Sequence, residues 1–493
     1  MRAFFILGVL LLLSPFLNAQ ELTAKIIDSK TNASIPFVAV QTAPYKGVIS
    51  NEEGEFVINL KDVDANMIEF SCLGYQSLTM SLEDLESNNY IIQLAPAINE
   101  LDAIYLTNTK PNVDSIISRV SENLIKNYKS EALSYNFFYR ETSYTNFENL
   151  DLEIKKSSKV KKRQLASANK ELAAMGSSIL NRKAVYFTDY SGTLNVLDDS
   201  LKKLNVEKAT KIINSNNEMS LEAIQKNAQN TVLRYLDTTM TYKLKTGLFK
   251  IEDSLSLNDG DDDNEKDLDE FKIEDLKKNT WSVLQKSQTG SGSMLQTILN
   301  TKIYDYTLVN ASVINGDVIY FITFEPKRSS AHFSGSLYVS ENTYGVLKLD
   351  YKYAKGKQGE KINLKLLLGV KYIENVNTGT IIYQQNDQTI YEPRYIKNES
   401  GQYFYLNRPL KFIENSSDRP KTTFNFKIIG NTISREEVLF SSITRLNRLT
   451  FETLEEKEVV AYDVLKKYNN STWSGQQTLA PTEELKAFDG KEN

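Results

Sequence analysis

Short runs of alternating apolar and polar residues, separated by turn-forming residues, fill the first hundred positions. Apolar side chains alternate over Leu22–Ile27 and return in a strand-like run over Met67–Cys72. Gly, Asn, Asp and Pro separate such runs at roughly eight- to twelve-residue intervals, which is typical of a sandwich of short strands. The pattern predicts a small β-sandwich over residues 20–95 and a linker over 96–111.

A larger domain is predicted from residue 112 to about 430. Apolar residues recur at spacings of three and four over 112–128, which predicts a helix. Strands follow, and period-two alternation is clearest over 347–353 and 361–372. Consecutive strands joined by short turns indicate an antiparallel meander. We therefore expect a mainly β protein with α insertions, whose second domain is a curved, half-barrel-like antiparallel sheet.

The alternation is interrupted between about residues 150 and 300. A lysine-rich stretch over 153–175 and a second stretch over 219–236 are predicted to be helical, and an acidic loop is expected over 258–270. This region is interpreted as a helical insertion into the sheet. Residues 431–493, which carry many charges, are expected to form a helical and extended tail.

The first nineteen residues have the pattern of a signal peptide. Arg2 precedes the apolar run Phe4–Leu13, and Ala19 supplies the small residue before a cleavage point. An apolar run of this length is too short to span a bilayer core of about 30 Å. The segment predicts export to the periplasm, to the outer membrane or to the cell surface, and not a cytoplasmic protein. Lipid attachment at the cleavage point is excluded because the only cysteine is Cys72.

Several turn and core residues of the first domain fall in a characteristic order. These residues are Asp28, Ile35, Pro36, Phe37, Val40, Gly47, Ser50, Asn51, Gly54, Phe56, Leu73, Gly74 and Tyr75. In this order they resemble the carboxypeptidase regulatory-like domain. The resemblance implies a seven-stranded, transthyretin-like sandwich that serves as an accessory module, frequent at the N-termini of outer-membrane proteins in Bacteroidota-type bacteria. It does not imply peptidase activity.

Two further resemblances concern the larger domain. The helix ending at Asn127-Tyr128, followed by Phe138–Glu141, resembles the segment after the regulatory domain in Bacteroidota outer-membrane proteins of uncharacterised function. The strand–turn–strand unit of Phe333–Val339 and Val346–Asp350 resembles the half-barrel of lipoprotein carriers. The first implies an envelope protein whose C-terminal region has no assigned activity, and the second covers under a hundred residues.

Composition limits the chemistry. A net charge of −5 spread over the chain argues against a nucleic-acid partner. One histidine and one cysteine exclude a His-rich zinc site and an internal disulfide. His332 is interpreted as a loop or strand-edge residue and Cys72 as a buried, inert thiol. No catalytic, cofactor-binding or metal-binding residue is predicted, and no cofactor is expected.

Three weaker patterns are explained more simply by solvated segments. Ser158–Lys161, Ser215–Asn217 and Lys245–Gly247 follow the order of the penicillin-binding elements but lack their context. The acidic run Asp259–Glu270 does not have the spacing of a calcium loop. The basic run Lys155–Arg163 could contact anionic headgroups, but a solvated helix face is the simpler interpretation.

Three functions remain open. The leading hypothesis is a non-enzymatic binding or structural accessory of the outer membrane, with envelope proteins, a glycan or a peptide as partner. The alternative is a lipid or lipoprotein carrier whose concave sheet is lined by apolar side chains. The third is a hydrolase that uses carboxylates alone, for which two carboxylates about 5 to 10 Å apart in a cleft would be required.

Overall fold

The computed structural model describes residues 21–43, 46–97, 111–128, 132–180, 184–212, 230, 233–247, 249–257, 270–314 and 316–488. They divide into two compact units. The N-terminal unit contains residues up to 72, 77–95 and 469–480, and the large unit contains 73–76, 96–468 and 481 onward. The predicted signal peptide and most of the predicted linker lie outside the described residues. None of the described helices combines the length and hydropathy that a membrane span requires.

The N-terminal unit contains two small sheets, ordered β4-β1-β7 and β3-β2-β5-β6. Its elements are β1 (Glu21–Asp28), β2 (Ala39–Ala43), β3 (Lys46–Ile49), β4 (Glu55–Asn59), η1 (Leu60–Asp62), η2 (Asp64–Asn66), β5 (Met67–Ser71), β6 (Leu78–Ser81), α2 (Leu82–Ser87), β7 (Ile91–Leu94) and η3 (Asn470–Trp473). Phe56 and Phe70, with ring centroids 5.8 Å apart, are fully buried in it. Seven described strands in two sheets confirm the predicted sandwich.

Several residues that carry the family resemblance stabilise the turns of this unit by hydrogen bonding backbone groups or by allowing a positive φ. The Ser50 hydroxyl accepts a hydrogen bond from the Val38 N–H at 2.9 Å and donates one to the Ile35 carbonyl at 3.2 Å. The Asn51 side chain accepts hydrogen bonds from two backbone N–H groups of the following turn, each at 2.9 Å. Gly54 has φ +74°, and a Cβ there would lie 2.5 Å from the Ile26 carbonyl oxygen. Only glycine fits this position without strain.

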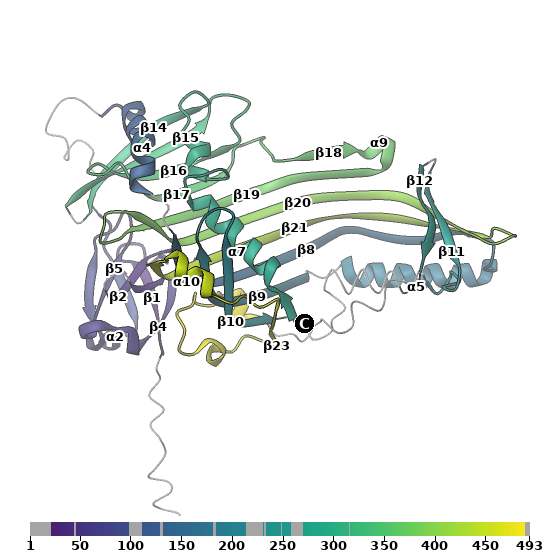
Figure 1. The fold of residues 1–493 in the computed structure, drawn as a ribbon, viewed down its shortest axis with the longest axis horizontal. Coiled ribbons are helices and arrows are strands. Elements are labelled where there is room, and N and C mark those ends of the chain that lie inside the picture. The colour runs from purple at the N-terminus through teal and green to yellow at the C-terminus, as the bar shows by residue number, and fades with distance from the viewer. Residues whose placement is uncertain are drawn as a thin grey trace, which may run out of the picture. The chain divides into compact units, whose positions relative to one another are not determined.

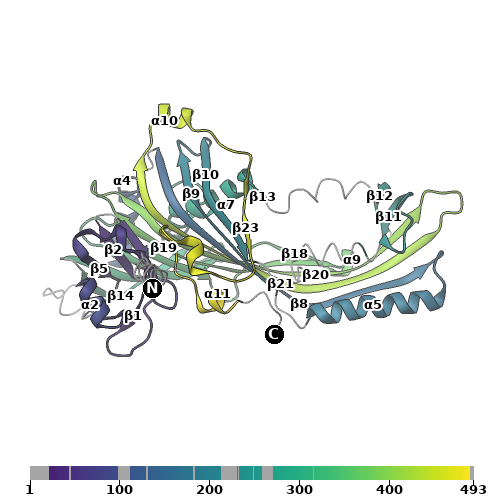
Figure 2. The ribbon, with the colours of Figure 1, turned by 90° about the horizontal axis from the view of Figure 1, so that it is seen from below.

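The large unit is built on one open sheet, with fourteen strands in its described part. Its main path runs β14-β15-β16-β17-β19-β20-β21-β8-β9-β10-β23, and β11, β12 and β18 attach beside it. The pairs along the path are antiparallel except for β10 with β23. Figure 2 shows the long strands curving along their length. The predicted mainly β class with a curved antiparallel sheet is confirmed.

The strands of the large unit are β8 (Leu133–Ser157), β9 (Ala184–Val196), β10 (Lys202–Ile212), β11 (Thr241–Thr246), β12 (Phe249–Ser256), β13 (Glu270–Lys272), β14 (Tyr304–Ile314), β15 (Asp317–Pro326), β16 (Phe333–Ser340), β17 (Val346–Tyr353), β18 (Lys361–Leu364), β19 (Val370–Gln385), β20 (Tyr391–Glu414), β21 (Lys421–Arg445), β22 (Val459–Ala461) and β23 (Asp463–Leu465). Its helices are α4 (Val113–Asn127), α5 (Lys162–Leu180), α7 (Ile273–Ser287), α8 (Met294–Ile298), α9 (Lys365–Leu368), α10 (Arg448–Thr453) and α11 (Glu483–Ala487).

Two helices cover one face of the long strands, which we call the inner face. Near the start of β8, the apolar side of α7 packs on Tyr135, Phe137 and Tyr139 in the main core. Near the end of β8, α5 packs on the face that carries Leu152 and Ile154. A bulge between the two stretches shifts the alternation, so that both sets of side chains lie on the same face. Figure 1 shows α7 crossing the strands and α5 lying beside the far end of β8.

The prediction that residues 150–300 form a helical insertion is wrong, because this range contains strands as well as helices. The strand β8 continues to Ser157, and β9 to β13 all lie inside this range. The lysine-rich helix begins at Lys162 and not at 153, because residues 153–157 pair with β21 or extend the strand. Of the helix predicted over 219–236 only Asn230 and residues 233–236 are described, and residues 258–269 of the predicted acidic loop lie outside the described residues.

The predicted boundary at residue 430 is also wrong. The strand β21 runs on to Arg445, and its polar stretch 431–437 pairs with β20 on one side and β8 on the other. Backbone pairing on both sides holds this stretch in the sheet whatever its side chains. Residues 469–480 of the predicted tail belong to the N-terminal unit, where the Gly475 N–H donates to the Glu21 carboxylate at 3.0 Å.

The predicted strand over 361–372 is interrupted by a chain reversal. The strand β18 ends at Leu364, α9 makes one turn, and β19 begins at Val370 and pairs antiparallel with β18. Period-two alternation continues through this turn, so the pattern alone could not reveal it.

An ion pair between neighbouring strands is buried on the opposite face. The Arg140 guanidinium on β8 donates two hydrogen bonds to the Asp189 carboxylate on β9, at 3.0 and 2.8 Å. The two side chains are 3% and 2% exposed. Burial alone would lower the pKa of Arg140, but the Asp189 carboxylate outweighs that effect and raises it. The pair is therefore a charge-assisted, two-point contact between β8 and β9.

We expect Asp189→Ala to lower the free energy of unfolding by about 3–5 kcal/mol, because the Arg140 charge would stay buried without its partner. Urea denaturation monitored by circular dichroism measures this loss. The control is Asp305→Ala, which removes the acidic partner of Lys327 from an exposed pair and should cost under about 1 kcal/mol. Equal losses in the two variants would contradict the assigned role.

Candidate functional site

A hollow of about 360 Å³ lies over the middle of the long strands, between the stretches that α7 and α5 cover. Side chains from six strands line it, and most of them are polar. The lining residues are Ser143, Thr145, Tyr186, Tyr353, Tyr372, Glu374, Val376, Asn377, Ser400, Gly401, Gln402, Thr432, Ile433 and Ser434.

The register of the sheet places most of these side chains in two adjacent rows. The first row consists of Asn377, Ser400, Ser434, Ser143 and Tyr186, each paired with the next across β19, β20, β21, β8 and β9. The second row consists of Glu374, Gln402, Thr432 and Thr145, paired in the same way. Residues directly opposite on neighbouring strands have side chains about 5 Å apart. The strands thus present a continuous polar strip.

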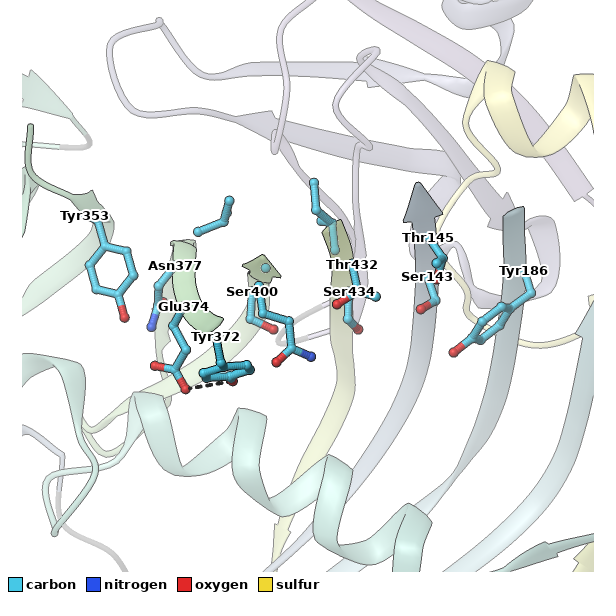
Figure 3. Close-up of a pocket in the computed structure, with 14 residues that line it drawn as sticks. Ser143, Thr145, Tyr186, Tyr353, Tyr372, Glu374, Asn377, Ser400, Thr432 and Ser434 are labelled. Atoms are coloured by element: carbon cyan, nitrogen blue, oxygen red, sulfur yellow. Dashed lines mark hydrogen bonds between the residues drawn. The ribbon is translucent and has the colours of Figure 1, made fainter. Parts of the chain in front are cut away.

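Figure 3 shows this strip, which runs from Tyr353 through Ser400 and Thr432 to Tyr186. At one end, the Tyr372 hydroxyl donates to the Glu374 carboxylate at 3.4 Å (Figure 3). The other carboxylate oxygen accepts the Glu360 N–H at 3.0 Å. Burial, and then the negative charge of Glu374, raises the pKa of Tyr372 above its usual value. Tyr372 therefore stays a neutral hydroxyl.

A buried polar network continues the strip under α7. The Lys286 ammonium donates to the Asn398 side-chain oxygen at 2.5 Å, and the Asn398 amide donates to Glu436 at 2.8 Å. The Tyr139 hydroxyl donates to the other oxygen of Glu436 at 2.7 Å. Glu436 lies directly opposite Glu141, which accepts a hydrogen bond from the Ser434 hydroxyl at 2.8 Å. Ser434 thus connects the hollow to the network.

Burial shifts the protonation equilibria in this network. It raises the pKa of Glu141 above its usual value of 4.5, an effect that the Ser434 hydrogen bond opposes and the neighbouring Glu436 increases. Burial also lowers the pKa of Lys286, although Glu436 acts in the opposite direction. Each of these groups already bonds a protein partner, and α7 covers them. Their geometry is that of a fixed support beside the hollow.

The hollow itself has the chemistry of a hydrogen-bonding surface. As described by the structure, its lining contains hydroxyls, amides, three tyrosines and one carboxylate, but no lysine, arginine, histidine or cysteine. No imidazole or amine there could deprotonate the lining hydroxyls, as nucleophilic catalysis by serine requires.

The two residues singled out for their chemistry lie elsewhere. His332 is exposed immediately before β16, where its Nδ1 lies 3.0 Å from the Gln358 carbonyl oxygen. Cys72 directly follows β5 and is half-buried, so the prediction of a buried thiol within the strand was wrong. Its strand ends one residue earlier than the apolar pattern indicated.

The structure does not bring the residues of the weaker patterns together into a site. Ser158 and Lys161 lie exposed in the turn between β8 and α5, and not at the buried helix start that the penicillin-binding element requires. Lys245 is the penultimate residue of the hairpin strand β11, and Ser215 lies outside the described residues. The basic run Lys155–Arg163 is mostly exposed, but it covers the end of β8, a turn and the first turn of α5. It is not one helix face.

Sequence reasoning predicted none of the residues that line the hollow except Tyr372, the last residue of the apolar repeat expected to line the cavity of a lipid carrier. Short polar stretches such as 398–402 and 431–436 resemble turns or domain ends when taken alone. The sequence does contain one indication that these stretches belong to strands: each lies beside a long run of alternating apolar residues. Phe404, Leu406 and Leu410 continue the alternation after the first stretch, and Phe424, Phe426 and Ile428 precede the second.

Residues 22–106 match the family model described as the CarboxypepD_reg-like domain. The resemblance read from the turn residues is therefore confirmed for this part of the chain. No curated protein matches the chain.

Two solved structures show a weak likeness. A DUF1329 family protein from Desulfovibrio piger is 11% identical, with 69% of this chain and 95% of that chain covered and a TM-score of 0.19. A chain of the Pseudomonas aeruginosa MucA/MucB complex is 7% identical, with 71% and 99% covered and a TM-score of 0.15. Because both TM-scores are far below 0.5, neither structure informs the function of this chain.

We expect Glu141→Gln to raise the free energy of unfolding near neutral pH. The raised pKa means that the folded state binds a proton more tightly than the unfolded state, so stability falls as pH rises from 4.5 through the raised value. Glutamine keeps the acceptor for Ser434 and removes this penalty. The stability gain over wild type should disappear as the pH falls toward 4.5.

Urea denaturation between pH 4.5 and 8 measures the difference between the variant and wild type. The control is Glu153→Gln on the exposed side of the same strand. A constant difference over this pH range would contradict the buried-carboxyl assignment.

Proposed function

We propose that this chain, which carries a carboxypeptidase regulatory-like domain, is a non-enzymatic binding protein of the bacterial envelope. Its ligand is a hydroxyl-rich molecule, a glycan, held in the hollow of the large unit. One observation carries the proposal: the two paired rows of hydroxyl and amide side chains across five strands.

The lining favours a glycan over other ligands of similar size. Hydroxyls and side-chain amides both donate and accept hydrogen bonds, which matches a ligand whose hydroxyls do the same. Tyr186, Tyr353 and Tyr372 add rigid rings with an apolar body and a polar tip, suited to the mixed surface of a sugar. A phosphate-bearing ligand would call for a cation, because phosphates are normally bound by arginine or lysine.

The lipid-carrier alternative has less support at this site. An acyl chain gains affinity by burying apolar surface. Only Val376 and Ile433 contribute aliphatic side chains to the lining. The apolar rows of the inner face are packed against α7 near the start of β8 and against α5 near its end.

The proposal that the protein is not an enzyme rests on the hydrogen bonds that its buried carboxylates already make. Glu141 and Glu436 lie directly opposite each other on β8 and β21, and a carboxylate hydrolase uses two such groups in a cleft. Both lie in the supporting network, bonded to Ser434 and to Asn398 and Tyr139 respectively. Export is supported by the signal-like N-terminal segment and by the accessory character of the domain over 22–106.

We expect wild-type protein to bind components of a glycan microarray that includes soluble peptidoglycan fragments. Ser400→Leu should weaken binding about tenfold or more, because leucine removes a hydrogen-bonding group and places apolar bulk between Asn377 and Ser434 in the first row. Ser400 is exposed, so the substitution should leave the fold intact. Isothermal titration with the best array ligand gives the affinity.

Ser417→Leu is the matched control, since Ser417 is an exposed serine in the turn between β20 and β21. Its binding should equal that of wild type. Absence of any glycan ligand, together with acyl chains retained in native mass spectrometry, would replace the proposal by the lipid-carrier hypothesis. Turnover of a bound glycan would refute the non-enzymatic part alone.

A further inference from the structure

The turn between β18 and β19 exposes large apolar side chains. Leu366 is fully exposed, at 104%, and Leu367 is 70% exposed. Ile362 and Leu364 on the adjoining strand are 48% and 40% exposed. Single exposed leucines are common on protein surfaces, but four apolar residues within six positions are a cluster that calls for a partner. We call residues 361–371 the leucine turn.

The structure holds the leucine turn in a fixed conformation. Gly369 ends α9 with φ +65°, and its carbonyl accepts the Asn407 N–H at 2.8 Å. A Cβ at Gly369 would lie 2.1 Å from the Asn407 carbonyl oxygen, so the turn sits directly on β20. Figure 1 shows the hairpin of β18 and β19 extending along the long strands with α9 at its end. The leucines are therefore presented from an anchored support.

Three lysines lie on the same turn as the exposed leucines, and two of them contact tyrosine rings of β20. Lys361 and Lys365 are exposed within the turn, and Lys371 lies on the returning strand. The Lys365 ammonium lies 4.3 Å from the ring centroid of Tyr405, and that of Lys371 lies 5.1 Å from the ring centroid of Tyr403. Exposed apolar residues flanked by lysines suit a boundary between acyl chains and headgroups.

We propose that the leucine turn docks this protein on an anionic lipid surface. Leu366 and Leu367 enter the outer part of the acyl region, while Lys361, Lys365 and Lys371 contact the lipid phosphates. The observation that favours lipid is charge. Residues 360–371 contain three lysines and a single carboxylate, Glu360, so the segment carries a net positive charge. Anionic headgroups attract such clusters.

The shape of the turn also favours a bilayer over a protein. A stable protein interface buries about 800 Å² on each partner and needs a complementary surface. One helical turn at the end of a hairpin offers only a few residues to such an interface. A bilayer can take up a few exposed leucines without a preformed groove. The proposal does not depend on the ligand of the hollow.

Flotation of the full-length mature chain with lipid vesicles tests the proposal. The vesicles contain either phosphatidylcholine alone or equal parts of phosphatidylcholine and phosphatidylglycerol. We expect binding to the anionic vesicles that falls about tenfold or more in the double variant Leu366→Ser/Leu367→Ser, since burial of each leucine contributes favourably. Lys361→Gln/Lys365→Gln should weaken binding to the anionic vesicles about tenfold and make the remainder less salt-sensitive.

The matched control is Leu449→Ser, because Leu449 is 77% exposed on α10 and follows Arg448. This variant should bind as wild type does. Leu366→Trp provides a direct measurement: its fluorescence emission should shift to shorter wavelength on adding anionic vesicles, and that of Leu449→Trp should not.

Three outcomes would overturn the proposal. The first is vesicle binding that the leucine double variant leaves unchanged, and the second is no binding to either vesicle. The third is self-association without lipid that the double variant abolishes, which would assign the turn to contact with a second copy of the chain. Circular dichroism of each variant verifies that its fold is retained.

Discussion

Backbone pairing along three very long strands, continuous between β20 and β21 and shifted only by local bulges between β21 and β8, is the constraint on which the rest of the large unit depends. The strands β8, β20 and β21 have 25, 24 and 25 residues, which corresponds to about 80 Å of chain each. Backbone hydrogen bonds run through β20 and β21 regardless of side-chain character, so one strand can be apolar under α7, polar at the hollow and apolar again under α5. A shorter strand would have to end where its polar stretch begins. Length makes the hollow possible.

The polar middle of the sheet is stable because its buried groups are paired. An unpaired buried polar group would cost about 1–3 kcal/mol, and a buried charge more. Here Lys286, Asn398 and Glu436 form a hydrogen-bonded chain, and Tyr139 closes it from the neighbouring strand. Ser434 satisfies Glu141 and also lines the hollow. The network therefore orients one wall of the hollow, and its buried carboxyl group makes the stability of that wall depend on pH.

The sequence predicted what local chemistry determines and missed what pairing determines. Ser50, Asn51 and Gly54 identified the first domain because each satisfies a particular turn, and turn chemistry depends on few neighbours. Alternation predicted the mainly β class for the same reason. The sequence alone predicts that a tail begins at residue 431, since nothing local shows that β8 and β20 pair with residues 431–437. The hollow was missed because its rows join residues more than 200 positions apart, such as Ser143 and Ser434.

The hollow and the leucine turn break the expected pattern of the sheet in opposite ways. At the hollow, polar side chains occupy a face that is apolar on both sides of it; at the turn, leucines occupy an apex that should be polar. Neither departure improves folding: the first gives up apolar burial, and the second adds a risk of aggregation. Departures from a sequence's own pattern are expected at functional sites, where local stability is lower than it could be. Folding alone therefore explains neither the polar hollow nor the exposed leucines. The hollow is suited to hydrogen bonding with a ligand, and the leucine turn is suited to apolar contact.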